Sequence, residues 1–250
     1  RGHITEITGK HVVNNLHNGG LVRAPYKVAV VVPLMPGGGG VSAVASFIYR
    51  ILADSGRYEP ELISVAVSSR DSASVRLLSP ASWIKKPRII MGNWEGKDFS
   101  HVGCYFSEFE FQRYRPRRVL TELLKKYDLI QVVSGAPTIG LAVSKTEKPV
   151  CIFVATTCKH ERCSLLARTK GLAKARIACM THLNSLMDRS AVQRMSHVFA
   201  ESEYTKRLLS QMVCEERLSI GPPGVDVDLF SPGDYRPDSY ILSVGRFSDP

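Results

Sequence analysis

The sequence predicts an α/β fold with a doubly wound, mostly parallel sheet, and three observations lead to this prediction. Apolar runs of strand length recur along the chain, and most are nearly continuous Val, Ile and Leu. Such runs are typical of strands buried on both faces of a parallel sheet, whereas strands with one solvated face alternate apolar and polar residues. Helical patterns separate the runs, and a glycine cluster follows the first of them, as in doubly wound domains.

The apolar runs and the segments between them place the elements in order. We expect six strands, at 27–33, 61–67, 128–134, 149–155, 197–202 and 240–245. Residues 119–127 place apolar side chains along one helical stripe, and residues 204–212 follow the turn-like ESE sequence, so both segments are expected to be helices. Residues 68–118 are less regular, with RIIM and HVGCYF suggesting short strands around the loop GNWEGKDFS.

Prolines and glycines mark one domain boundary. Residues 221–239 contain four prolines and three glycines, which break both the strand and the helix periodicity. We therefore expect an N-terminal extension at 1–25, a doubly wound domain at 26–220, a linker at 221–239 and the first strand of a second domain at 240–250. One strand cannot bury its own apolar residues, so the chain is interpreted as the first part of a longer protein.

Composition favours a cytoplasmic protein. The 250 residues are 44% hydrophobic, yet no stretch reaches the roughly 18 uninterrupted apolar residues of a membrane span. The first 20 residues are polar and lack the apolar block of a signal peptide. Six cysteines without a dense framework fit a reducing compartment better than a disulfide scaffold.

The charge predicts an anionic partner. A net charge of +10 and a pI of about 9.4 attract nucleic acid, acidic lipid or phosphorylated small molecules. Basic residues gather at 113–118 and along 159–194, where they alternate with Leu, Ile and Met at spacings that a helix could sort onto two faces. Such a helix either packs on a core or lies on an anionic membrane. No aromatic platform is interleaved with these charges, which disfavours nucleic acid as a partner.

Four consecutive glycines, Gly37 to Gly40, stand between the first apolar run and the next helical segment. At the end of the first strand of a doubly wound sheet, a glycine turn lets a phosphate reach the N–H groups that begin the helix. A turn without a ligand is the alternative. The dinucleotide fingerprint fits poorly, because Ser42 and Ala43 stand where its third glycine belongs and the second run ends in VSSR without an acidic residue, so a nicotinamide enzyme is disfavoured.

Two stretches together resemble one enzyme family. These are PGGGGVSAVASFIYRILADSG at 36–56, and PPGVDVDLFSP at 222–232 leading into YILSVGRFSDP at 240–250. They are similar to the retaining sugar-nucleotide glycosyltransferases of family 4, which have the GT-B fold. That family has a glycine pair before a Val and a helix, a GVD segment that joins two domains, and a VGR strand that opens the second. The family carries Asn where this chain has Pro223.

The resemblance implies a metal-independent, retaining transferase that needs no cofactor, with a nucleotide-diphosphate sugar as donor substrate and with this chain inactive alone. It places Gly39, Gly40 and Arg246 at the donor phosphates. The family's His near the acceptor is expected close to Ala155, and His160, five residues later, is the nearest candidate for a catalytic residue. The candidate acceptor contacts are Gly38, Glu108, Glu110 and Ser202.

Other functions stay open at this point. Sugar-nucleotide 2-epimerases share the fold and keep an acid pair in the N-terminal half, where Glu108 and Glu110 form a close pair. A non-catalytic module that holds an anionic polymer or membrane is the other alternative. We expect a lipid-linked or phosphorylated acceptor, and peripheral association with the inner face of a membrane. No metal site is expected, because neither the DVD sequence at 226–228 nor the spacing of Cys158, Cys163, Cys179 and His182 fits a common ligand set.

Overall fold

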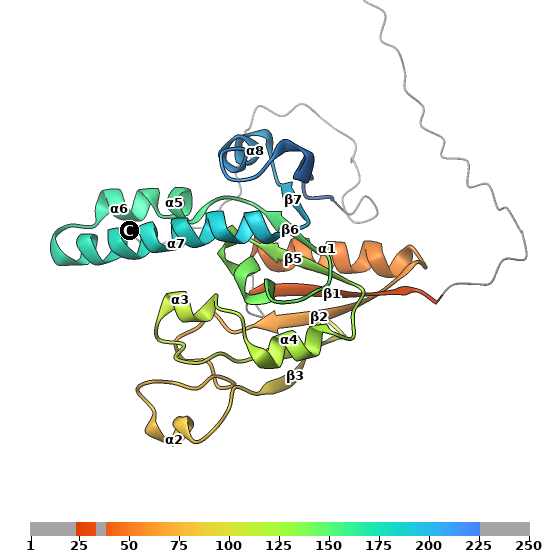
Figure 1. The fold of residues 1–250 in the computed structure, drawn as a ribbon, viewed down its shortest axis with the longest axis horizontal. Coiled ribbons are helices and arrows are strands. Elements are labelled where there is room, and N and C mark those ends of the chain that lie inside the picture. The colour runs from red at the N-terminus through yellow and green to blue at the C-terminus, as the bar shows by residue number, and fades with distance from the viewer. Residues whose placement is uncertain (1–23, 34–38, 226–250) are drawn as a thin grey trace, which may run out of the picture.

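The computed structural model describes residues 24–33 and 39–225. Within them, eight strands form one sheet in the order β3-β4-β2-β1-β5-β6-β7-β8 (Figure 1). Only the β3–β4 pair is antiparallel, and the other neighbours in this sheet are parallel. The strands are β1 (Tyr26–Pro33), β2 (Tyr58–Val65), β3 (Ile89–Trp94), β4 (Lys97–Val102), β5 (Leu129–Ser134), β6 (Val150–Val154), β7 (His197–Ala200) and β8 (Leu218–Ile220).

Helices connect the parallel strands, which confirms the predicted doubly wound α/β class. They are α1 (Gly40–Asp54), α2 (Pro80–Trp83), α3 (Glu110–Arg113), α4 (Arg118–Leu124), α5 (Cys158–Glu161), α6 (Cys163–Arg168), α7 (Gly171–Arg194) and α8 (Glu203–Leu209), with 3₁₀ helices η1 (Pro137–Val143) and η2 (Glu215–Arg217).

Both faces of the sheet are buried, as the continuous apolar runs predict. In β1, Val28, Val30 and Val32 belong to one hydrophobic cluster, whereas Ala29 and Val31 belong to another. All five side chains are at most 1% exposed. Because successive side chains of a strand point to opposite faces, β1 is covered by a layer on each side.

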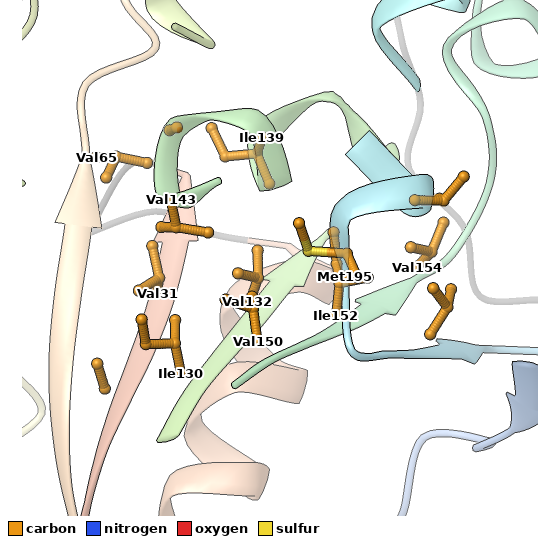
Figure 2. Close-up of a cluster of buried hydrophobic side chains, with 14 of the residues drawn as sticks. Val31, Val65, Ile130, Val132, Ile139, Val143, Val150, Ile152, Val154 and Met195 are labelled. Carbon is orange, nitrogen blue, oxygen red and sulfur yellow. The ribbon is translucent and has the colours of Figure 1, made fainter. Parts of the chain in front are cut away.

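Different helices supply the two layers. α1 packs its apolar side chains against the cluster that contains Val28. On the other face, α4, η1, α8 and the end of α7 contribute to the larger cluster. Figure 2 shows Val143 of η1 and Met195, which follows α7, in this cluster with Val31 and Ile152.

Five of the six predicted strands lie in the described residues, and all five are confirmed as strands. One of the five, predicted at 61–67, has different bounds in the structure. It is β2, which begins at Tyr58 and ends at Val65. The sequence hides this start because Pro60 disfavours a central strand. β4 pairs with β2 only from Leu62 onward, so β2 has a single neighbour at Pro60, where a missing N–H is tolerated. No predicted strand corresponds to the short strand β8.

The predicted loop GNWEGKDFS is wrong, since most of it belongs to the hairpin of β3 and β4. Trp94 pairs with Lys97, and only Glu95 and Gly96 form the turn. Both turn residues have positive φ, 50° and 75°. Two such residues make the type I′ turn that suits the twist of a two-residue hairpin.

The two predicted helices form at α4 and α8, both shorter than expected. α4 ends at Leu124, yet the predicted stripe persists beyond it, because Leu120, Leu124 and Tyr127 are all buried. The basic segment 159–194 contains three helices, and the buried side of α7 is mostly polar: its buried residues are Thr181, Asn184, Asp188, Ala191 and Val192. This helix therefore does not divide into an apolar and a basic face.

Some predictions fall outside the described residues. These are the strand at 240–245, Arg246, Gly38, the extension up to residue 23 and the linker from residue 226 onward. The described part of the linker, Gly221–Val225, forms neither helix nor strand. Gly224 lies so close to α1 that a Cβ there would be 2.0 Å from the Phe47 ring, so this segment packs against the domain.

A buried guanidinium joins the ends of β2, β4 and α3. Arg117 is 5% exposed and donates to Val102 O at 2.8 Å, to Ala66 O at 2.9 Å and to Arg113 O. No carboxylate in the described part of the chain pairs with it. Arginine is suited to this place because its planar group carries five donors, which can satisfy carbonyls that leave several elements at once.

We predict that Arg117→Met destabilises the chain by about 2 kcal/mol or more, because it removes the guanidinium donors to Ala66 O and Arg113 O while keeping the apolar stem. Val102 O loses one donor and keeps the N–H of Ala66. Arg118→Met is the matched control, since Arg118 is the exposed neighbour and its loss should cost less than about 0.5 kcal/mol. Urea unfolding measures both free energies. Equal losses for the two variants would contradict a structural role of the buried guanidinium.

Candidate active site

The carboxyl ends of β1 and β5 mark the topological switch point of the sheet. From β1 the chain adds β2, β4 and β3 on one side, and then returns to add β5, β6, β7 and β8 on the other. In open α/β sheets, ligands bind beyond the carboxyl ends of the strands at such a point. The loops that follow β1, β5 and β6 are therefore the candidate site.

Gly39 and Gly40 lie at this edge, directly before and at the start of α1. Gly39 has φ 125° and ψ 178°, a conformation that side chains rarely adopt, and its carbonyl accepts from Ala43 N at 3.2 Å. A Cβ on either glycine would meet no atom within 4 Å in the described structure. The backbone conformation at residue 39 thus requires glycine. At residue 40, neither the backbone nor packing against the described residues requires glycine.

The first turn of α1 is open to an anion. Among the described residues no side chain caps this helix, and its first turn contains no acidic residue. The first N–H groups of a helix have no partner within it, and the helix dipole adds a partial positive charge there. The same edge therefore offers several N–H groups to a phosphate.

The loops after β5 and β6 are bonded to each other. Gly135 O accepts from Ala155 N at 3.1 Å and from Thr156 N at 2.8 Å. Ser134 Oγ donates to Ala136 O at 2.7 Å. These bonds hold the two loops together beside the glycine turn, so the site has a defined second wall.

His160 lies on α5, just after the β6 loop. Its Nδ1 is 2.7 Å from Thr157 Oγ1, and its ring meets that of Tyr204 edge-on, with the centroids 6.1 Å apart. The side chain is exposed, and Nε2 has no partner within the described structure. Ser202 caps α8, because its Oγ accepts from Thr205 N at 3.2 Å. His160 is thus oriented, with one nitrogen available.

Asp188 of α7 holds both loops from behind. Its Oδ1 accepts from Thr138 N at 3.0 Å and its Oδ2 accepts from Cys158 N at 2.8 Å. Thr138 follows β5 and Cys158 follows β6, so one carboxylate fixes the starts of η1 and α5. Asp188 is fully buried, and burial raises its pKa to about 6 although the two N–H bonds favour the charged form.

A second polar cluster surrounds Glu110. Its Oε1 accepts from Asn184 Nδ2 at 2.7 Å and from Arg162 Nη2, and Tyr114 OH lies 3.4 Å away. Burial alone would lower the pKa of Arg162, but the hydrogen bond and charge of Glu110 raise it. Burial and the same carboxylate raise the pKa of Tyr114. Glu110 therefore connects α3 with α7 and with Arg162, which lies between α5 and α6.

Glu108 serves a different segment. Its carboxylate accepts from Leu77 N at 2.9 Å and from Leu78 N at 3.2 Å, with Arg76 Nε 3.7 Å away. Burial alone would raise its pKa, but these N–H bonds and the charge of Arg76 lower it. Glu108 and Glu110, two positions apart in sequence, thus bind two separate parts of the structure.

The structure brings Gly39, Gly40, His160 and Ser202 to one edge of the sheet. Sequence reasoning missed Asp188, Asn184 and Arg162, which build the walls behind that edge. A signal for the first two was present, because Thr181, Asn184 and Asp188 recur at the spacing of one helix face. Asn184 Oδ1 and Thr181 Oγ1 are buried and have no hydrogen-bond partner among the described residues.

A serine, a histidine and an aspartate also lie in line. Ser64 Oγ is 2.9 Å from His101 Nδ1, and His101 Nε2 is 2.5 Å from Asp71 Oδ2. This order is that of a hydrolase triad, but Ser64 is fully buried and cannot reach a substrate. The chain of bonds instead ties the loop after β2 to the sheet.

The described residues include neither a candidate metal site nor a helix that could span a membrane. They contain no group of three or more His, Cys, Asp or Glu side chains that could hold a metal ion. None of the helices in the described part is long and apolar enough to cross a membrane. Burial raises the pKa of Cys158 to about 11, so this thiol stays neutral near pH 7.

No family model matches the chain, and no curated protein matches it. Several solved structures are similar in fold. A UDP-N-acetylglucosamine 2-epimerase shares 15% identity over 79% of this chain and 48% of its own, with a TM-score of 0.43. The UDP-GlcNAc 2-epimerase from Methanocaldococcus jannaschii shares 13% over 78% and 45%, with a TM-score of 0.42.

A glycosyltransferase from Rickettsia africae shares 19% identity over 85% of this chain and 47% of its own, with a TM-score of 0.39. The chain thus spans about half the length of these proteins. With TM-scores below 0.5 and identities below 20%, these likenesses determine neither the family nor the substrate of this chain.

We predict a pH-dependent stability that comes from Asp188. Because its folded pKa of about 6 exceeds the ordinary 3.8, its contribution is fully present below about pH 4 and is lost as the pH rises through about 6. The free energy of unfolding, relative to that of Asp188→Asn, should therefore fall by roughly 3 kcal/mol between about pH 4 and pH 7.

Urea unfolding across this pH range measures the difference. Asp54→Asn is the control, because Asp54 is exposed at the end of α1. A fall of the same size in both comparisons would show that the effect does not come from the buried carboxylate.

Proposed function

We propose that this chain is the N-terminal, acceptor-side part of a family 4-like glycosyltransferase with the GT-B fold, which transfers a sugar from a nucleotide-diphosphate donor. One observation carries the proposal: the Gly39–Gly40 turn lies at the carboxyl end of β1, at the switch point of a doubly wound sheet. A glycine turn in this place lets a diphosphate approach backbone N–H groups without a side chain in between.

In this proposal, the donor diphosphate lies against the first turn of α1. Its negative charge grows as the glycosidic bond breaks, so N–H donors aimed at it stabilise the transition state more than the ground state. Arg246, which the resemblance places at the same phosphates, would pair with them from the second domain. The proposed reaction is a front-side substitution that retains the anomeric configuration and needs no metal ion.

His160 is the proposed residue at the acceptor side. Thr157 engages its Nδ1, which leaves Nε2 of an exposed and oriented ring for a sugar or acceptor hydroxyl. The loop that carries it is bonded to the β5 loop and held by Asp188. A fixed ring loses little entropy when substrate binds, which is what positioning of a substrate group requires.

The 2-epimerase alternative has weaker support. It needs two acids that act on one sugar nucleotide, and Glu108 and Glu110 were the candidates. Glu108 accepts from the Leu77 and Leu78 amides, whereas Glu110 accepts from Arg162 and Asn184. Two carboxylates committed to different segments do not form a shared acid–base pair.

A membrane partner is proposed for the segment that holds α6 and the first turns of α7, which extends beyond the sheet (Figure 1). Between residues 158 and 180 it contains six Lys and Arg residues and one Glu. Leu165 is 50% exposed and Leu172 is 88% exposed. Exposed leucines beside unbalanced positive charge fit a surface of anionic lipid, which would bring a lipid-linked acceptor to the site.

The glycine turn offers a matched test in the full product of the gene. We expect Gly39→Ala to lower kcat/KM for the nucleotide sugar at least about tenfold, because a Cβ there strains the turn and stands where the diphosphate would lie. Gly56→Ala is the control, since Gly56 also has positive φ and open space but lies at the other end of α1. Transfer should persist in EDTA.

The transfer assay uses a panel of nucleotide sugars, with product release followed for each variant. Equal losses in Gly39→Ala and Gly56→Ala would indicate a general effect of strain and contradict the donor site. Conversion of one sugar nucleotide into its 2-epimer, without transfer, would favour the epimerase instead.

The membrane proposal predicts that the chain sediments with anionic vesicles more than with neutral ones at low salt, and that salt weakens the binding. Replacing Arg168, Lys174 and Arg176 by Ala should abolish the difference. The control replaces three exposed cations elsewhere, Arg57, Lys145 and Arg194, which changes the net charge equally. If both triple variants lose the same amount of binding, the segment is not the contact surface.

A further inference from the structure

A basic pocket of about 250 Å³ lies in the segment between β2 and β3. Its cationic lining consists of Arg70, Arg76, Lys85, Lys86 and Arg88. It is separate from the α1 turn and from the α6–α7 segment, and neither proposal above uses it.

The pocket carries an excess of positive charge, because Arg76 is the one cation of its lining that has an ion pair with a carboxylate among the described residues, that of Glu108. Its single carboxylate, Asp71, is fully engaged: Oδ1 accepts from Ala73 N and Ser74 Oγ, and Oδ2 lies 2.5 Å from His101 Nε2. Lys85 and Lys86 have no ion pair with any described residue. Like charges gather around a cavity at a cost, which an anion in the cavity would relieve.

Unused hydrogen-bond donors accompany this charge. The hydroxyls of Ser72 and Ser79 line the pocket and have no partner in the described structure. Arg76 Nε is buried and lies 3.7 Å from the nearest Glu108 oxygen, too far for a hydrogen bond. Arg88 uses Nη2 for one bond, to Ser72 O at 3.3 Å. The pocket thus offers hydroxyl, ammonium and guanidinium donors to one ligand.

The backbone around these donors is held in place. Ser82 Oγ accepts from Arg76 N at 2.8 Å and donates to Ser79 O at 2.7 Å. Arg88 N donates to Ala73 O, and Gly103 approaches Ala73 so closely that a Cβ on it would lie 2.1 Å from that oxygen. A pocket whose walls are already ordered loses less entropy on binding.

The segment that holds the pocket follows β2 at the same edge of the sheet as the proposed reaction. β2 runs parallel to β1, with Pro33 opposite Val65, so the segment after β2 leaves the sheet at the same edge as the glycine turn. α2, which lies within this segment, and α5, which carries His160, are both on this side of the sheet in Figure 1. A ligand that extends from the pocket can approach the same edge.

We propose that this pocket binds a phosphomonoester group of the acceptor, an inference that rests on the proposed transferase function. A phosphomonoester carries close to two negative charges and three acceptor oxygens, which match several cations and free hydroxyls better than a carboxylate would. The donor diphosphate is assigned to α1, so the acceptor is the substrate left for this site.

Isothermal titration of the 250-residue chain tests the site directly, with inorganic phosphate and glycerol 3-phosphate as probes. We expect Lys85→Ala with Arg88→Ala to weaken binding at least about tenfold, since each removes a charge-assisted contact. The control is Arg57→Ala with Arg194→Ala, which removes the same charge from exposed sites outside the pocket and should leave the affinity within about twofold. Equal weakening in both double variants overturns the proposal.

A second arm identifies the source of the phosphate. Vesicles containing phosphatidic acid present the same phosphomonoester on a lipid. Vesicles of equal charge made with phosphatidylglycerol, a phosphodiester, are the reference, because both kinds would bind the α6–α7 segment alike. The site is supported if the double variant Lys85→Ala with Arg88→Ala removes binding in either arm. Binding in the titration alone indicates a soluble acceptor, and binding to the vesicles alone indicates a lipid acceptor. If the double variant removes binding in neither arm, the proposal is overturned.

The transfer assay separates this inference from the proposed function. In the full product of the gene, the double variant should raise the acceptor KM at least about tenfold and leave the donor KM unchanged. Transfer that proceeds with an unchanged acceptor KM refutes the pocket while the transferase stands. Phosphate binding that depends on Lys85 and Arg88, in a protein without transfer activity, refutes the transferase and keeps the anion site.

Discussion

The hydrogen bonds of the buried Arg117 guanidinium are the interaction on which one half of the sheet's carboxyl edge depends. Parallel strands end together, and the carbonyls beyond them leave the ladder without partners. Arg117 donates to Ala66 O after β2 and to Val102 O at the end of β4, and so fixes the start of both following segments. The segment that begins after β2 contains the basic pocket, and the segment after β4 contains Glu108 and Glu110.

Asp188 meets the opposite need in the other half of the edge. The chain turns into η1 after β5 and into α5 after β6, and each helical start has N–H groups that lack an internal partner. Asp188 accepts from Thr138 N and Cys158 N, one from each start. A polar side of α7 is therefore buried where an apolar side would leave these amides unbonded. The cost is a carboxylate held away from water, which its raised pKa reflects.

Arg117 and Asp188 order the backbone at the carboxyl edge of the sheet, and three features of the described residues there could bind a ligand. The glycine turn presents amides at β1, His160 presents a ring nitrogen after β6, and five cations surround a pocket after β2. All three features favour negative or hydrogen-bonding groups. They follow β1, β2 and β6, which end at the same edge because β1 is parallel to β2 and β5, and β5 is parallel to β6. Parallel topology thus brings residues that are 121 positions apart in sequence, Gly39 and His160, to one edge of the sheet.

The sequence by itself determined the layers of this fold. Strands with continuous apolar runs, such as 27–33 and 149–155, are buried only when other elements pack on both faces of the sheet. It also located the glycine turn, since a positive φ at Gly39 demands glycine wherever the strand lies. It suggested short strands that overlap β3 and β4 but drew the loop between them too long, and it missed the early start of β2 and the buried polar side of α7. Only the tertiary structure decided the roles of Asp188 and Arg117, because their hydrogen-bond partners lie on other elements, up to 51 positions away. A polar side chain on a helix reads as solvated until the backbone groups it satisfies are known.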